Sequence, residues 1–317
     1  MAVASSEVGR RPKRWRLHEP PPASLIEALP DLHQLKVRLL WNRGLHEPEL
    51  IRNHHQTSFA DLHDPFLMPA MAAAVQRLKR ASAEGQLVTI YGDFDADGVT
   101  GSAILDRALS RAGVRTDSYI PKRLEEGYGL NRAASLGIDT IVCDHHKLPD
   151  ELPKALALLH PQLGGYPFPQ LCAAGVCFKL AQALGDADDL TDFAAVGTLA
   201  DMVPLLGENR VLARHGLEKL RRNPSLGLAA MMDLAGIDQA RLTCSDVSFS
   251  LAPHINASGR LDDAGLAFRL MVSHDDAEAA ALANRLRGLN EERQRLTRQV
   301  LAAAREQVRM HPDSQLA

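Results

Sequence analysis

One feature of the sequence limits the possible folds most. Two short apolar runs each lead directly into a cluster of carboxylate or imidazole side chains. Gln86–Tyr91 precedes the segment GDFDADG at residues 92–98, and Thr140–Cys143 precedes the tripeptide DHH at residues 144–146. Apolar runs of this length predict buried strands. The other predicted strands are Arg115–Ile120 and Leu156–Leu159. Helical patterns alternate with these runs, which predicts an α/β fold with a parallel sheet flanked by helices. Both clusters are then expected at the carboxyl edge of the sheet, where such folds bind ligands.

The first cluster carries three carboxylates at alternate positions, Asp93, Asp95 and Asp97. Carboxylates this close repel one another unless a cation lies among them. Oxygen ligands suit Mg²⁺ or Mn²⁺, so all three are candidate metal ligands. Aspartate also favours helix N-caps and polar loops, and this alternative stays open for each of them taken alone.

The second cluster adds imidazole side chains. One of the pair His145 and His146 could bind a metal ion while the other holds a phosphate group. Asp201, in the apolar segment AAVGTLADMVPL, is a third candidate because an ionised carboxylate among apolar residues needs a partner. A lone residue of either kind can equally be structural. The prediction is that the three distant segments together form one metal site.

A third type of site is predicted for the polar loop PHINASGR. Its candidate phosphate-binding residues are Asn256, Ser258 and Arg260, because small polar residues lead to an arginine whose guanidinium suits a phosphate. A surface turn is the alternative. Tyr128 and Asn131, in the segment GYGLN, are candidate substrate contacts, although a turn explains them equally well.

The pattern along the chain predicts three regions. Residues 1–24 are polar, basic and rich in proline, and are expected to form a flexible arm. Residues 25–274 are expected to form the catalytic domain, which becomes mostly helical after Asp201. Residues 275–317 carry charges of both signs and predict a long connecting helix, with a downstream substrate-binding domain absent from this sequence.

Composition excludes several classes of protein. No stretch of about 18 apolar residues occurs, and the basic N-terminus lacks the apolar segment of a secretory signal. The four cysteines form no CxxC pair, which is typical of thiols in a reducing compartment, so we expect a cytoplasmic protein with no membrane contact. A net charge of −3 means that a nucleic-acid site would need a local basic patch or bound cations.

Together these segments resemble the DHH phosphoesterase superfamily and, within it, the bacterial exonucleases specific for single-stranded DNA. The motifs that carry the resemblance are, in order, YGDFDADGVTGSAIL, GYGLN, DHH, AAVGTLADMVPL and NASGRL. The resemblance implies these metal ligands: Asp95, Asp97, His145 and Asp201, with Asp93 in or beside the same shell. It implies these phosphate contacts: His146 and Arg260. The implied catalytic residues are Asp95, Asp97, His145, His146 and Asp201.

The activity implied by the resemblance is 5′-to-3′ hydrolysis of single-stranded DNA at a two-metal site that uses Mn²⁺ or Mg²⁺, in DNA repair and recombination. The implied partners are single-stranded DNA and single-strand binding protein, with the chain as a monomer. Two alternatives stay open. One is a superfamily phosphodiesterase acting on short oligonucleotides or cyclic dinucleotides. The other is a catalytically silent DNA-binding or scaffold protein with a DHH fold.

One departure from the family pattern lies between Asn131 and the DHH motif. Family members carry there a strand ending in a Val-Asp-x-Gly-like sequence, whose aspartate bridges the two metal ions. No such sequence follows Asn131 here, and Asp139 precedes its strand and cannot substitute. A crossover between parallel strands needs about a dozen residues. We therefore expect that residues present in the family are missing from this stretch.

Overall fold

The computed structural model describes residues 16–121, 136–261 and 265–310. The chain divides into two compact units, Met1–Thr57 and Ser58–Ala317. Tyr128 and Asn131, the candidate substrate contacts, lie outside the described residues. None of the described helices is both long enough and apolar enough to cross a membrane.

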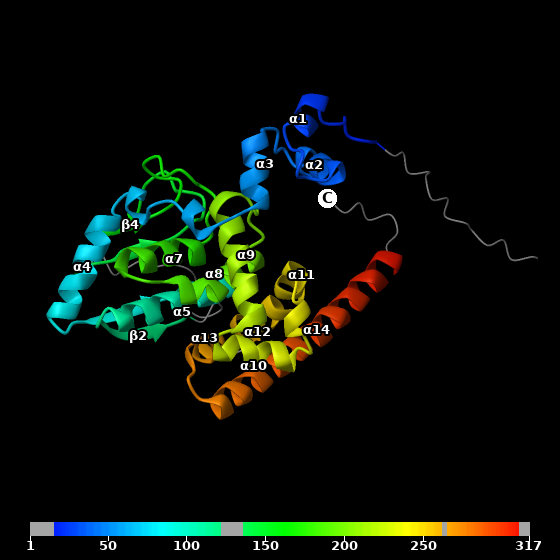
Figure 1. Ribbon diagram of the computed structural model, residues 1–317. Helices are drawn as coiled ribbons and strands as arrows, with labels where there is room; N and C mark the ends of the chain where they lie inside the picture. Colours follow the sequence, from blue (N-terminus) through cyan, green and yellow to red (C-terminus); the bar gives the residue numbers. More distant parts are fainter. Residues whose placement is uncertain (1–15, 122–135, 262–264, 311–317) are drawn as a thin grey trace, which may run out of the picture. The chain divides into compact units, whose positions relative to one another are not determined.

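The first unit contains three short helices, α1 (Ala23–Glu27), α2 (Gln34–Trp41) and α3 (Pro48–His55) (Figure 1). α3 begins with a proline at its first position, where the backbone N–H would have no partner within the helix. Each helix buries apolar side chains, among them Leu25, Val37 and Ile51. The Arg52 guanidinium donates to the Ala28 carbonyl at 2.5 Å and so joins α3 to the end of α1.

Four parallel strands in the second unit form two pairs. β1 (Leu87–Tyr91) pairs with β2 (Arg115–Tyr119), and β3 (Ile141–Cys143) pairs with β4 (Ala157–Leu159). Each strand lies within one residue of the position that the sequence predicted, and the predicted parallel direction is confirmed. The described strands nevertheless form two separate two-stranded sheets rather than one continuous sheet.

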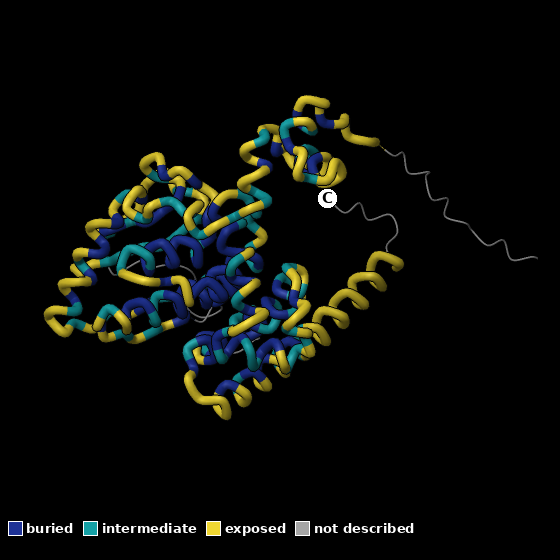
Figure 2. Tube along the Cα trace, in the orientation of Figure 1, coloured by how far each residue is buried: buried dark blue, intermediate teal, exposed yellow. Residues whose placement is uncertain are grey.

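Helices form most of the core of the second unit. Its first helices are α4 (Met71–Ala83), α5 (Ala96–Arg111), α7 (Ala173–Leu184), α8 (Thr191–Ala200) and α9 (Gly207–Arg222), with 3₁₀ turns at Phe59–Asp61, Pro65–Leu67 and Asp188–Leu190. α7 and α8 are apolar on nearly every side, which is typical of helices enclosed by other elements. They pack on α5, and Figure 2 shows this region as the most deeply buried part of the chain. α5 in turn packs on β1 and β2.

The remaining helices include a long C-terminal helix and three others that pack on its first half. They are α10 (Leu226–Leu234), a 3₁₀ turn (Gln239–Arg241), α11 (Cys244–Asp246), the π-helix η6 (Val247–Leu251), α12 (Ala252–Leu261), α13 (Gly265–Val272) and α14 (Asp276–Met310). α10, α12 and α13 pack on α14, which buries Ala279, Ala283, Leu286 and Asn290 at helical spacing. Beyond Asn290, α14 is almost entirely exposed (Figure 2).

The segment PHINASGR is helical, and our prediction of a polar loop there was wrong. It belongs to α12, where Ile255 and Ser258 are buried at helical spacing. The π-helical turn ends two residues before Pro253, which has no N–H to donate to the preceding turn. The small polar residues that suggested a loop are there because this helix packs closely against its neighbours.

Candidate metal centre

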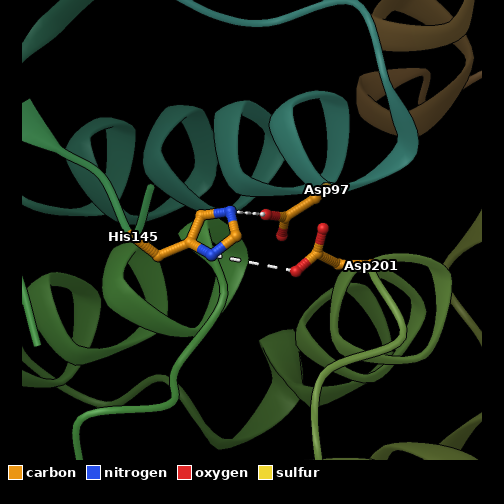
Figure 3. Close-up of side chains that lie close together, drawn as sticks. All are labelled: Asp97, His145 and Asp201. Atoms are coloured by element: carbon orange, nitrogen blue, oxygen red, sulfur yellow. Dashed lines mark ion pairs between the residues drawn. The ribbon is translucent and has the colours of Figure 1, made fainter. Parts of the chain in front are cut away.

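Side chains from three elements meet near the carboxyl ends of β1 and β3. Asp97 lies in the first turn of α5, His145 follows β3, and Asp201 follows α8. One ligand atom of each lies within 4.8 Å of the others, and no other such group of three occurs in the part of the chain that the structure describes. Figure 3 shows the two carboxylates on the same side of the His145 ring, with a dashed line from one ring nitrogen to each.

The spacing within this group suits a divalent cation better than direct hydrogen bonds. His145 Nε2 lies 3.5 Å from Asp97 Oδ2, and His145 Nδ1 lies 3.8 Å from Asp201 Oδ2. Hydrogen bonds between such atoms are shorter, about 2.7–3.2 Å. Two ligand atoms that are each about 2.1 Å from one ion lie about 3.0–3.5 Å apart, which agrees with the distance from His145 Nε2 to Asp97. An imidazole gives one nitrogen to one ion, so the distance from Nδ1 to Asp201 is not a spacing around that same ion. Two carboxylates and an imidazole also supply the charge and the donor types that Mn²⁺, Mg²⁺ or Zn²⁺ accept.

The N-terminus of α7 holds the Asp97 carboxylate in place. Asp97 Oδ2 accepts a hydrogen bond from the Ala173 N–H and Oδ1 accepts one from the Ala174 N–H, both at 2.8 Å. Asp97 is only 4% exposed, and burial raises its pKa to about 6, although the Ala174 hydrogen bond and the nearby His145 oppose this rise. A bound cation would favour the ionised carboxylate and so offset the cost of its burial.

Replacing Asp97 with alanine is expected to destabilise the fold as well as remove a metal ligand. The backbone N–H groups of Ala173 and Ala174 would lose their acceptors inside the protein, so we expect a fall of about 2–4 kcal/mol in the free energy of unfolding. Asp97→Asn keeps one oxygen acceptor and should lose less. Urea denaturation without metal measures both variants. An alanine variant as stable as the wild type would show that α7 does not depend on this carboxylate.

Two glycines allow helices to approach the centre closely. A Cβ atom on Gly197 of α8 would lie 2.9 Å from Asp97 Oδ1 and 2.5 Å from the Ala174 Cβ. A Cβ atom on Gly259 of α12 would lie 2.6 Å from the Cβ of Phe94, which follows Asp93. Any larger residue would therefore push α8 away from Asp97 or α12 away from the aspartate-rich loop.

The other two aspartates of the first cluster have local roles in the loop before α5. Asp95 caps α5, because its Oδ1 accepts a hydrogen bond from the Gly98 N–H at 2.8 Å. Asp93 Oδ1 accepts one from the Phe94 N–H at 2.7 Å. Neither belongs to the group of close ligand atoms. Asp95 is near enough for its charge to raise the pKa of Asp97, and it adds to the larger effect of burial on the pKa of Asp201.

Asp144 organises the DHH loop. Its Oδ1 accepts hydrogen bonds from the N–H groups of His145, at 2.7 Å, and His146, at 3.1 Å, and it also lies 2.7 Å from His146 Nδ1. The bond to Asp144 raises the pKa of His146, whose side chain is 71% exposed. The two histidine rings lie 4.6 Å apart, centroid to centroid. His145 therefore faces the two carboxylates, while the His146 ring is exposed to solvent.

A further histidine supports this loop, and the sequence analysis missed it. His160 directly follows β4 and is 1% exposed. Its Nε2 lies 2.8 Å from the His146 carbonyl oxygen, and its Nδ1 accepts a hydrogen bond from the Gln162 N–H at 3.2 Å. The ring must therefore carry its proton on Nε2 and donate to His146. The position of His160 directly after a predicted strand could have indicated a place near the site.

The structure gives the three predicted phosphate-binding residues of α12 different surroundings. Asn256 Oδ1 accepts a hydrogen bond from the Ala96 N–H at 2.7 Å, so Asn256 holds the aspartate-rich loop. Ser258 is fully buried, and its hydroxyl donates to the Ile255 carbonyl at 2.9 Å. This arrangement turns the Ser258 hydroxyl toward its own helix rather than toward a ligand. Arg260, on the same helix, is exposed.

Comparison with known proteins agrees with this geometry. Residues 87–200 match the family model "DHH family, N-terminal domain". The single-stranded-DNA-specific exonuclease RecJ of Bacillus subtilis is 38% identical over 330 residues, which cover 93% of this chain and 42% of that protein. The chain thus spans less than half the length of this relative. The match has more positions than this chain has residues, so the relative contains internal positions without a counterpart here.

Solved structures show the same fold. A crystal structure of exonuclease RecJ bound to manganese is 33% identical with a TM-score of 0.71, over 78% of this chain and 71% of that one. RecJ of Thermus thermophilus in complex with Mn²⁺ is 30% identical with a TM-score of 0.80, over 96% of this chain and 48% of that one. The same protein with Mg²⁺ gives a TM-score of 0.74 at 30% identity, over 92% and 44%. The chain belongs to the DHH family, among its RecJ exonucleases.

Proposed function

We propose that this chain hydrolyses phosphodiester bonds of single-stranded DNA in the 5′-to-3′ direction and depends on Mn²⁺ or Mg²⁺. The group of Asp97, His145 and Asp201 carries the proposal, because it joins segments about 50 residues apart into one site with metal-ligand spacing. The RecJ relatives were solved with Mn²⁺ and with Mg²⁺, which supports the choice of metals. Asp93 and Asp95 are the additional ligands that we assign to a second ion.

A bound divalent cation would polarise the phosphoryl oxygens and activate water. The residues of this chain then have to hold the phosphate group. His146 suits this role, because the hydrogen bond to Asp144 raises its pKa and favours the cationic form, and its ring is exposed beside His145. Arg260 suits it as well, because α12 contacts the aspartate-rich loop through Asn256.

Two exposed apolar side chains near Asp201 support a single-stranded substrate. Met202 directly follows Asp201 and is 67% exposed, and Phe249 on the π-helix is 70% exposed. The Ser248 hydroxyl donates to the Leu199 carbonyl at 2.8 Å and fixes the π-helix against this end of α8. Unpaired bases stack on exposed aromatic rings, whereas the bases of a duplex are already stacked.

The decisive experiment uses a 5′-labelled single-stranded oligonucleotide with Mn²⁺, a matched duplex and an EDTA control. We expect release of labelled mononucleotide from the single strand alone, and none with EDTA. Progressive shortening of the labelled strand, with labelled mononucleotide released only at the end, would contradict the assigned direction. A folded protein that binds the strand without cleaving it would favour the alternative of a silent DNA-binding protein.

Replacing Arg260 with alanine is expected to weaken substrate binding about tenfold and to leave metal binding nearly unchanged, because the exposed guanidinium contacts phosphate rather than the ion. Fluorescence anisotropy with a single strand and calorimetric Mn²⁺ titration measure the two effects. Arg222→Ala is the matched control, since Arg222 is also exposed but lies at the far end of α9. A loss of Mn²⁺ binding in Arg260→Ala would overturn the phosphate role.

We assign catalysis to the second unit, since all three residues of the candidate centre belong to it. The expected setting is the cytoplasm, in DNA repair and recombination, with single-strand binding protein as a partner and the chain as a monomer. Gel filtration with and without single-strand binding protein tests the last two points.

A further inference from the structure

Two irregular stretches of backbone border the candidate metal centre on the side of Asp201. The first is Met202, which directly follows this aspartate and has a φ angle of 61°, in the left-handed region. The second is the π-helix η6, a rare conformation that is often found at functional sites. The Ser248 hydroxyl, inside η6, donates to the Leu199 carbonyl at 2.8 Å. This bond fixes η6 against the end of α8 that carries Asp201.

The left-handed conformation of Met202 costs free energy that a glycine would avoid. Among the described residues, only Ala70 and Met202 have a positive φ without being glycine. A Cβ atom strains the backbone in this region, and glycine is the usual residue where a helix ends in this conformation. The end of α8 therefore does not explain the methionine side chain. Its presence at a strained position points to a contact made by the side chain itself.

Phe249 presents a second apolar side chain, from the π-helix. It is 70% exposed, more than any other phenylalanine, tyrosine or tryptophan in the part of the chain that the structure describes. Met202 is 67% exposed. Single exposed apolar side chains are common on protein surfaces and need no explanation. Two of them on irregular backbone beside one site, joined through the bond from Ser248 to Leu199, indicate a binding surface.

We propose that Met202 and Phe249 together bind an unpaired nucleobase next to the metal centre and so determine the specificity for single strands. This inference rests on the proposed function and adds two specificity-determining residues to it. The Phe249 ring offers a flat apolar surface to a base, and the polarisable sulfur of Met202 packs well on aromatic rings. Neither side chain has a strong hydrogen-bond donor or acceptor, so binding should tolerate any base sequence. A base in a duplex reaches them only after it is unpaired and unstacked.

The test at Met202 separates the effect of the side chain from that of the backbone. Met202→Gly removes both the thioether and the strain, so the thermal midpoint should rise by about 1–3 °C. The same variant should bind a labelled single-stranded oligonucleotide at least about fivefold more weakly, because the base loses one of its contacts. Met202→Leu keeps an apolar side chain in the same conformation and should retain the affinity and the midpoint of the wild type.

The matched control is Ala70→Gly, which relieves the other strained position. It should raise the thermal midpoint in the same way and leave the affinity for the oligonucleotide unchanged. A stabilised Met202→Gly variant with wild-type affinity would overturn the proposal. A destabilised variant would also overturn it, since the side chain would then serve packing.

The test at Phe249 measures the preference for single strands. Fluorescence anisotropy in EDTA, without metal-dependent cleavage, compares a labelled thymidine oligonucleotide with its matched duplex. Phe249→Ala should weaken binding of the single strand at least about fivefold, as expected for one lost stacked base, and leave duplex binding unchanged. Phe249→Trp keeps a flat ring and should bind at least as well as the wild type. Phe66→Ala, which removes another exposed ring on the 3₁₀ turn Pro65–Leu67, should change neither affinity.

These binding measurements do not need catalysis, so they separate the base-binding site from the nuclease function. If the chain cleaves DNA, the loss in both variants should appear in KM rather than in kcat. Cleavage with an unchanged single-strand preference in Phe249→Ala would reject the base-binding site and leave the proposed nuclease function standing. Equal affinity of the wild type for the single strand and the duplex would also reject it.

Discussion

Replacing Glu208 with alanine is expected to lower the free energy of unfolding by about 3–5 kcal/mol, because it leaves the Lys179 ammonium buried without its counter-ion. Both side chains are fully buried, and Lys179 Nζ lies 3.0 Å from Glu208 Oε1. Glu208 also accepts hydrogen bonds from the Tyr166 hydroxyl at 2.7 Å and from the His63 N–H at 3.1 Å. Lys179 itself donates to the His63 carbonyl.

This network joins α9 to α7, the helix whose N-terminus holds Asp97. Burial lowers the pKa of Lys179, and the nearby Glu208 opposes this change. Equilibrium urea denaturation measures the loss of stability. The matched control is the double variant Lys179→Met with Glu208→Gln, which removes both charges at similar volume, keeps an amide oxygen as acceptor for Tyr166 and His63, and should be closer to the wild type. A single variant that loses less than about 1 kcal/mol would show that Lys179 finds another partner or water.

Replacing Asp201 with asparagine is expected to reduce the proposed nuclease activity about a thousandfold, which corresponds to about 4 kcal/mol in the activation barrier. Asp201 offers a ligand atom to the centre, and its side chain is 25% exposed. Its ion pair among the described parts of the chain is with His145, at 3.8 Å, and its side chain is not enclosed by the core. The loss should therefore be confined to metal binding and catalysis.

Asp201→Asn separates catalysis from stability more cleanly than a change at Asp97. The measurement is the rate of mononucleotide release with Mn²⁺, together with calorimetric Mn²⁺ titration and urea denaturation of the same variant. Asp233→Asn, an exposed carboxylate on α10, is the control and should retain full activity. An Asp201→Asn variant that binds Mn²⁺ and cleaves DNA at the wild-type rate would remove Asp201 from the centre.

The positions of the strands and of the candidate ligands could be predicted because each has a local signal. β1 and β3 are short apolar runs, and the residues that follow them, such as Asp97 and His145, are of types rarely gathered without a ligand. The rule that the carboxyl ends of parallel strands share one edge then placed the two loops together. The prediction of Asp201 as a ligand rested on a weaker signal, which is a carboxylate at the end of an apolar helix.

The sequence could not predict which backbone groups bond to the site residues, because such groups belong to residues with no distinctive side chain. The N–H groups that hold Asp97 belong to Ala173 and Ala174, two ordinary apolar residues more than 70 positions away. The prediction also missed that NASGR is helical. Its small residues look like a loop in sequence, but they are required by contacts between distant segments, such as that of Gly259 with Phe94. Both features arise when distant segments pack, and local propensity carries no information about them.

The sequence by itself therefore determined the strand positions, the parallel direction and the chemical types gathered at the strand ends, since these depend on periodicity and residue chemistry within short windows. Tertiary structure alone decided which of those side chains meet. It brought Asp97, His145 and Asp201 within 4.8 Å of one another and used Asp95 and Asn256 to hold the backbone. These outcomes depend on close packing of residues far apart in the chain, where a shift of one side chain changes every neighbour.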